Sequence, residues 1–155
     1  MHDKLAPNDI LLLLQNERVE AVSRKDGLCS VIRKSREFDT MVVMQRKNWK
    51  SYRYFHPSTL VSVYKLIKPA TDRDILKKLG NSYVVNPFLM FAFLSMHEEN
   101  PEHFIFFSCD YCGNLRNVSV FWSSIENGWD IGVSKLQRYL PWPAGHRVVI
   151  FNQHL

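Results

Sequence analysis

A short basic and aromatic segment carries the most distinctive chemistry in this 155-residue chain. Cationic side chains neutralise phosphates and flat rings stack on bases, so the combination is typical of proteins that bind nucleic acid. The segment holds four cations and three rings with no acid among them: Arg46, Lys47, Trp49, Lys50, Tyr52, Arg53 and Tyr54. It predicts a binding surface for an anionic partner, with nucleic acid as the first candidate.

The same segment also has a purely structural interpretation. If residues 46–55 form a strand, Lys50, Tyr52 and Tyr54 share one face and the intervening residues share the other. The rings then fill the core, while lysine and arginine keep an outer strand soluble. A partly extended loop is the alternative to a strand here. No ribonucleoprotein, KH or zinc-finger motif accompanies the segment, so the identity of the anion stays open.

The distribution of charge supports the choice of this region. The chain carries a formal charge of +5, and seven basic and two acidic residues between positions 33 and 53 account for the same value. Such an asymmetry favours a partner of negative charge, and its ordinary alternative is a solvated surface. Residues 33–37 read as a solvated turn between two strands, which narrows the binding candidate to residues 46–53.

A second pattern is the pair Cys109 and Cys112, whose spacing lets two thiolates share one zinc ion. A structural zinc site takes four ligands, and the nearest further candidates are His97 and His103. These histidines reach the pair only if the end of the preceding helix folds back onto the hairpin. Because the sequence has no second CxxC motif, two small residues beside a turn are the favoured interpretation. Zinc is the one cofactor considered, and none is expected.

The common catalytic motifs are missing, including the nucleophile elbow, the phosphate-binding loop, the dinucleotide fingerprint and the zinc-protease helix. The chain is therefore read as a binding module without catalytic residues. A second hypothesis rests on its many aromatic and methionine side chains, which suit an apolar pocket or a protein contact. It describes a small-molecule or protein-interaction module, in the latter case a homodimer. An enzyme built from scattered histidines is the third hypothesis.

The elements that would position these residues follow from caps, turns and apolar patterns. Asn8 is a good N-cap and Gly27 a C-terminal stop, which predicts a helix over residues 8–25. Thr71 and Asp74 have the spacing of a capping box, and Pro87 opens an apolar helix. Helices are thus expected over residues 8–25, 58–68, 71–79 and 86–99, and strands over residues 28–33, 38–45, 104–109, 117–123, 129–135 and 147–151.

Together these elements predict an α+β fold in one domain over residues 1–155. It has an N-terminal helix with short strands, a buried central helix around residues 88–96 and a C-terminal antiparallel meander. The longest apolar runs fall far short of the ~20 residues that a membrane span needs, so no membrane partner is expected. Three cysteines suit a reducing compartment and no signal peptide is recognised, so the expected location is cytoplasmic.

The last part of the chain resembles a known group of sequences. The segments Gly128-Trp-Asp-Ile-Gly-Val and Trp142-Pro-Ala-Gly-His-Arg-Val-Val are similar to the endings of small uncharacterised bacterial proteins, some of them carried on mobile gene cassettes. The resemblance covers only this C-terminal stretch and implies no functional residue. It implies a bacterial accessory protein.

Overall fold

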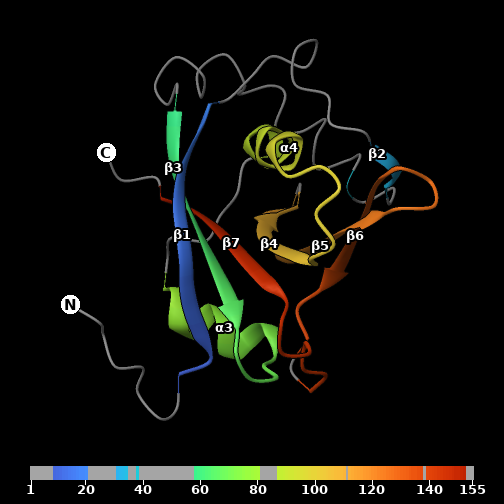
Figure 1. Cartoon of the computed structure of the whole chain (residues 1–155). Helices are drawn as coiled ribbons and strands as arrows, with labels where there is room; N and C mark the ends of the chain where they lie inside the picture. The colour runs from blue at the N-terminus through green and yellow to red at the C-terminus, as the bar shows by residue number, and fades with distance from the viewer. Residues whose placement is uncertain are drawn as a thin grey trace.

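The described part of the chain is organised around one mixed β-sheet. The computed structural model describes residues 9–20, 31–34, 38, 58–80, 87–110, 112–137 and 139–152. The elements are β1 (Leu11–Glu20), β2 (Val31–Lys34), β3 (Ser58–Leu66), α3 (Asp72–Leu79), α4 (Pro87–Met96), β4 (Phe104–Cys109), β5 (Leu115–Ser123), β6 (Gly128–Lys135) and β7 (Arg147–Asn152). The seven strands lie in the order β1-β3-β7-β4-β5-β6-β2 (Figure 1).

The last strand lies in the middle of this sheet. β7 pairs antiparallel with β3 on one side and parallel with β4 on the other. It therefore joins the antiparallel pair β1 and β3 to the antiparallel strands β4, β5 and β6. The short strand β2 closes the far edge by pairing parallel with β6. The C-terminal strand of the described chain is consequently interior to the sheet, whereas β1 and β2 form its two edges.

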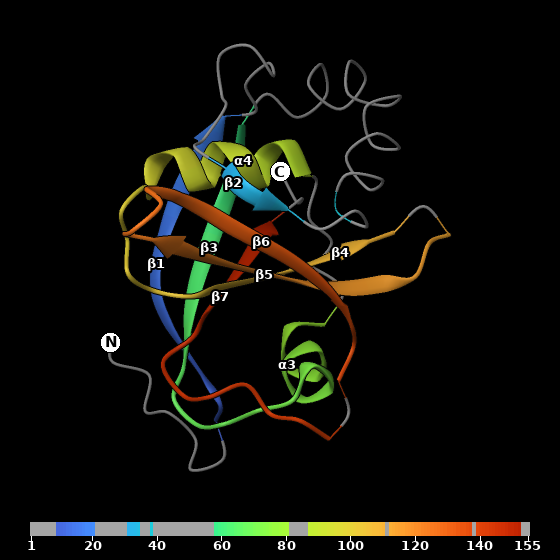
Figure 2. The same ribbon diagram turned by 90° about the vertical axis from the view of Figure 1, so that its right-hand side faces the viewer.

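The two helices cover opposite faces of the sheet (Figure 2). β4 shows the arrangement most clearly, because its side chains alternate between the faces. Phe104 and Phe106 pack against Phe93 of α4, with ring centroids 5.3 and 5.7 Å apart. Ile105 and Phe107 belong to the cluster on the α3 side. A strand covered on both faces is apolar throughout, which explains the continuous run at the start of β4.

The expected α+β fold is wrong, because the described chain is mostly β-structure. The helix expected over residues 8–25 is the ten-residue strand β1, and the helix expected over residues 58–68 is β3. These two segments pair with each other along almost their whole length. The four leucines of β1 fit either periodicity, and the partner strand decides the outcome.

Several other elements are confirmed. Both halves of the capping box of α3 are present, with Thr71 as N-cap. β4, β5 and β6 pair antiparallel in chain order, but the expected C-terminal meander is wrong, because the fourth expected strand inserts between β3 and β4 and runs parallel to β4. α4 exists and is largely buried, but it ends at Met96.

Phe38, the expected start of a strand, is helical and packs edge-on against Phe91. No helix in the described ranges is long and apolar enough to cross a membrane.

Candidate functional site

The basic and aromatic segment lies outside the described residues. Arg46, Lys47, Trp49, Lys50, Tyr52, Arg53 and Tyr54 all fall between residues 38 and 58, where no placement is described. The nucleic-acid surface that they predict therefore stays a prediction.

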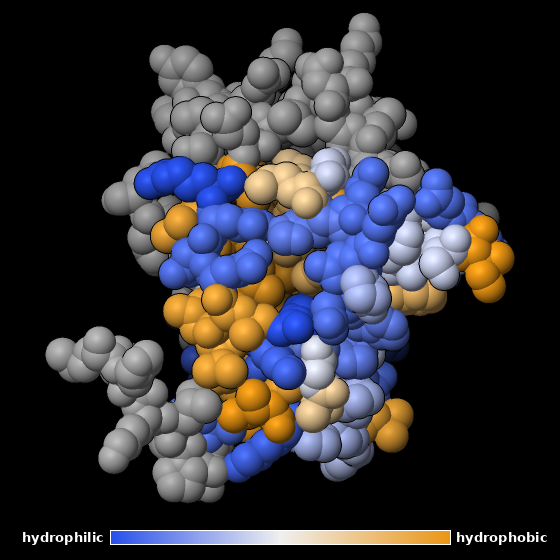
Figure 3. Space-filling model, in the orientation of Figure 1, coloured by the Kyte–Doolittle hydropathy of each residue, from blue (hydrophilic) through white to orange (hydrophobic). Residues whose placement is uncertain are grey.

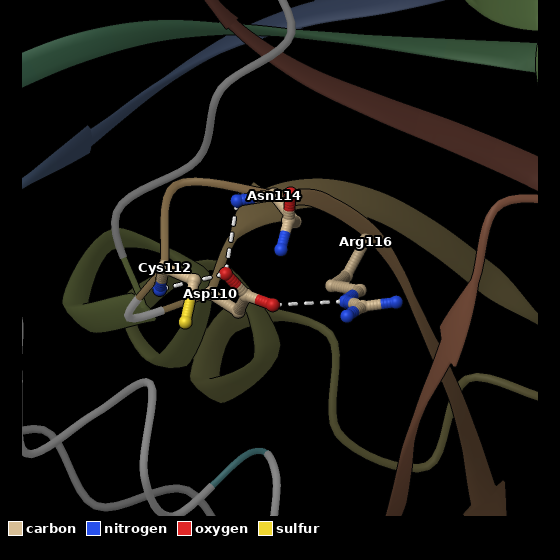
Figure 4. Close-up of polar contacts among 4 residues, drawn as sticks. All are labelled: Asp110, Cys112, Asn114 and Arg116. Carbon is tan, nitrogen blue, oxygen red and sulfur yellow. Dashed lines mark hydrogen bonds and ion pairs between the residues drawn. The ribbon is translucent and has the colours of Figure 1, made fainter.

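The two cysteines lie in the hairpin between β4 and β5, as expected. Asp110 organises this turn, because its carboxylate accepts the backbone N–H groups of Cys112 and Asn114, both at 2.9 Å (Figure 4). The same carboxylate accepts the Nε–H of Arg116 at 3.1 Å. Desolvation opposes ionisation of Asp110, but the hydrogen bonds from Asn114, Arg116 and Cys112 outweigh it and hold the pKa below its usual value. The polar contacts of this hairpin thus account for its fold.

The Cys109 thiol is poorly suited to bind a metal or to act as a nucleophile. Burial raises its pKa, and the neighbouring negative charge of Asp110 raises it further. A thiolate is the species that coordinates and attacks, so a raised pKa keeps this side chain in its less reactive form. Cys112 is exposed, and both cysteines are free thiols.

The four residues suggested for zinc do not come together. His103 directly precedes β4 and Cys109 ends it, so about 20 Å of extended strand separates them. His97 lies at the same end of the sheet as His103, with its ring 5.9 Å from that of Phe104. In the part of the chain that is described, no three His, Cys, Asp or Glu side chains gather around a possible metal position. The extended strand between the histidines and the cysteines is the physical reason.

A small pocket opens where β1, α4 and the starts of β4 and β7 meet. Its volume is about 160 Å³, and its walls combine apolar with polar side chains: Leu14, Gln15, Val63, His97, Asn100, Glu102, Phe104 and Arg147. β1 contributes Leu14 and Gln15 at a bulge in its pairing with β3. Exposed apolar side chains gather over β1, where Leu13 and Leu14 reach the surface (Figure 3). The pocket therefore has a partly apolar rim.

One histidine of the pocket wall, His97, is hydrogen-bonded to a carboxylate outside the lining, Glu17. His97 Nε2 lies 2.6 Å from Glu17 Oε1, and the side chains are only 17% and 20% exposed. The imidazole also stacks on Phe93, with centroids 4.2 Å apart. His97 follows the last turn of α4 and Glu17 faces it from β1, so packing of the helix on the sheet creates the pair. A short, half-buried hydrogen bond of this kind holds both side chains in place.

Arg147 also lines the pocket. Arg147 is 19% exposed, and its ionic partner among the described residues is Glu102, at an Nη2 to Oε1 distance of 3.4 Å. A guanidinium has five N–H donors, so most of those of Arg147 have no partner among the described residues. Asn100 adds another donor, because its Oδ1 already accepts the backbone N–H of Glu102 and its amide nitrogen remains.

A pair of histidines lies on the opposite face of the sheet. His103 follows Glu102 in the chain and His146 precedes Arg147, so each histidine is next to one member of this ion pair. His103 Nδ1 and His146 Nε2 are 3.1 Å apart. The rings of Phe121 and Trp142 flank them, with centroids 5.2 Å from His103 and 5.6 Å from His146 respectively. Burial lowers the pKa of His146, and the neighbouring His103 lowers it further, so the ring favours its neutral form.

Local sequence patterns did not identify Glu17, Asn100, Glu102, Arg147 or His146 as site residues. No motif connects them, since they lie on β1, after α4, before β4 and around the start of β7. Only the insertion of β7 between β3 and β4 brings them together, and no local spacing encodes that insertion. His97 and His103 were identified as possible zinc ligands, but the expected partners were the cysteines and not the residues that they contact in the structure.

Comparison with known proteins finds no matching family model and no significant match among curated proteins or solved structures.

Proposed function

We propose that this protein is a non-enzymatic binding module for a small carboxylate ligand, which it takes in the pocket between β1, α4 and β7. The observation that carries the proposal is Arg147, a largely buried guanidinium in a pocket wall that has one long ion pair with the described residues. A guanidinium fork matches the geometry of a carboxylate and can hold it by two parallel hydrogen bonds.

Partial burial makes this guanidinium a better anion site than a surface arginine. Arg147 is largely shielded from water, and a charge in such a place interacts more strongly than one in bulk solvent. Glu102 is 41% exposed, so its carboxylate pairs with the guanidinium of Arg147 from the side that faces the solvent. An incoming carboxylate competes with Glu102 for Arg147, and the amide of Asn100 lies in the same wall to donate a further hydrogen bond.

The size and lining of the pocket limit the rest of the ligand. A volume of about 160 Å³ is close to that of an engineered cavity of about 150 Å³ that binds benzene. Leu14, Val63 and Phe104 provide apolar surface for a hydrocarbon part. The pocket thus fits a carboxylate attached to one ring or a short branched chain. A nucleotide is too large for it.

Titration of the full chain with benzoate, with neutral benzamide as the matched probe, tests this function. We expect benzoate to bind at least about tenfold more tightly than benzamide, because only the anion engages Arg147 by charge-assisted hydrogen bonds. Arg147→Gln should abolish this preference. Glu102→Gln should strengthen benzoate binding, because it removes the competing carboxylate. Calorimetry or ligand-observed nuclear magnetic resonance provides the affinities.

Arg116→Gln is the matched control, because Arg116 is 18% exposed and also ion-paired, but lies in the β4–β5 hairpin. It should leave the preference for benzoate unchanged. Equal binding of benzoate and benzamide, or a preference that survives Arg147→Gln, contradicts the proposal.

A second function, nucleic-acid binding, is supported by the charge of the chain. The formal charge of +5 is matched by that of residues 33–53 alone, and aromatic rings stand among the cations of residues 46–54. This surface would take a larger anion than the pocket does, so the two functions are separable by their ligands.

A further inference from the structure

The two histidines at the start of β4 and β7 form a cross-strand pair outside the proposed ligand pocket. Phe104 and Arg147 are directly paired in the parallel ladder, and His103 and His146 precede them by one residue on each chain. The backbone N–H of Arg147 donates to the carbonyl of His103 at 2.8 Å, so both histidines are held by the ladder itself. This backbone pairing brings the two side chains together, with Nδ1 of His103 3.1 Å from Nε2 of His146.

We propose that His103 and His146 together chelate a divalent transition-metal ion such as Zn²⁺ or Ni²⁺, through Nδ1 of the first and Nε2 of the second. Imidazole nitrogen is a preferred ligand of these ions. The site goes beyond the proposed carboxylate pocket and does not depend on it.

The distance between the nitrogens suits a shared ion. Bonds of about 2.0 Å place two ligand nitrogens about 3.3 Å apart at a tetrahedral angle, and about 2.9 Å apart at a right angle. The observed 3.1 Å falls between these values, so the separation of the two nitrogens suits an ion once each ring turns its lone pair toward it. Without metal, the same distance allows one ring to donate its proton to the other.

The surroundings of His146 prepare it as a ligand. Nε2 of His146 faces Nδ1 of His103, so a proton on the other ring nitrogen of His146 leaves a lone pair on Nε2. The lowered pKa of His146 favours the same neutral form at neutral pH. Glu102 and Arg147 are the nearby charged groups, of which Glu102 acts on His146 in the opposite direction.

Water completes the coordination shell in this proposal. The described chain places no third His, Cys, Asp or Glu at the pair, so the described residues supply two ligands. Such a site is exchangeable and differs from a closed structural zinc site of four protein ligands. It is also distinct from the cysteine hairpin, which lies at the other end of β4.

The test is calorimetric titration of the full chain with Zn²⁺ and fluorescence titration with Ni²⁺ at neutral pH. We expect one ion per chain, and quenching of tryptophan emission by Ni²⁺, because Trp142 lies 5.6 Å from His146. His103→Gln and His146→Gln should each lower the affinity at least about tenfold, since losing even an outer-shell partner of a metal site costs that much. The double change Cys109→Ser with Cys112→Ser should leave the affinity unchanged.

Two results overturn the proposal: no saturable binding of either ion, or binding that survives both histidine changes. The proposal is also overturned if only the double cysteine variant loses binding, because the ion then binds at the hairpin. If one histidine variant does not fold, the other histidine variant and the double cysteine variant still test the site. Because protons and the metal ion compete for the imidazole nitrogens, the affinity should fall as the pH is lowered. An affinity that does not depend on pH contradicts a site made of two histidines.

Discussion

Asp72 shows how one side chain ties distant parts of this protein together. Its carboxylate is fully buried at the start of α3, where it accepts three hydrogen bonds. The donors are the amide of Asn117 at 2.7 Å, the backbone N–H of Gln137 at 2.8 Å and the indole of Trp142 at 2.6 Å. They come from β5, from the residues after β6 and from the segment before β7. Asp72 therefore fixes the path of the chain into β7, on which both proposed sites depend.

Removal of this carboxylate should be severely destabilising. Asp72→Ala leaves one buried and two partly buried donors without an acceptor, and each unsatisfied buried group costs about 1–3 kcal/mol. We expect a loss of at least about 3 kcal/mol in the free energy of unfolding, measured by urea denaturation. Asp130→Ala on the half-exposed part of β6 is the control and should change stability by less than about 0.5 kcal/mol. A loss of similar size in both variants contradicts the role given to Asp72.

At the scale of elements, β1 and β3 show why the periodicity of a short segment is ambiguous. Leu11 to Leu14 are apolar at every position, and such a run does not distinguish a buried helix from a strand. Pairing with β3 makes the segment a strand, and a shift in register between Leu13 and Gln15 changes which residues face the pocket. The bulge thus connects the irregular pairing of β1 with the lining of the ligand site.

The element α3 shows the opposite case, in which local sequence is sufficient. The Thr71 hydroxyl accepts the backbone N–H of Asp74, and the Asp74 carboxylate accepts that of Thr71, both at 3.2 Å. These bonds satisfy two donors at the helix start, regardless of the rest of the fold.

Thr71→Ala should lower the free energy of unfolding by about 1 kcal/mol, because it removes the N-cap acceptor. Thr71→Ser keeps a hydroxyl at the same position and should stay close to the unmodified protein. Urea denaturation of both variants measures the difference. Equal destabilisation by alanine and serine contradicts capping as the cause.

At the scale of the whole molecule, the uneven distribution of charge leads to a prediction about nucleic acid. If residues 46–53 bind phosphates, the affinity for a single-stranded oligonucleotide should fall steeply with salt. Changing Lys47, Lys50 and Arg53 together to alanine should reduce the slope of log affinity against log salt by about 2, at about 0.7 per phosphate contact. Fluorescence anisotropy at several salt concentrations provides this slope.

The matched control changes three lysines outside the segment, Lys68, Lys77 and Lys78, to alanine. The triple control loses the same charge, so an effect of net charge alone appears in both proteins. Binding that does not depend on salt, or an equal effect of both triple changes, removes nucleic acid as a candidate.

The sequence alone determined the features that depend on neighbouring residues. The capping box of α3, the apolar helix α4 and the hairpins of β4, β5 and β6 follow from caps, turns and short-range patterns. It also singled out His97 and His103 as residues capable of chemistry, although it matched them with the cysteines.

Only the tertiary structure decided that β1 and β3 are strands and that β7 lies between β3 and β4. It also gave His97 and His103 their partners, Glu17 and His146, which stand 80 and 43 residues away in the sequence. The physical reason is the same in each case. Strand pairing and the packing of polar side chains between strands are long-range contacts, and no pattern of neighbouring residues encodes which segments meet.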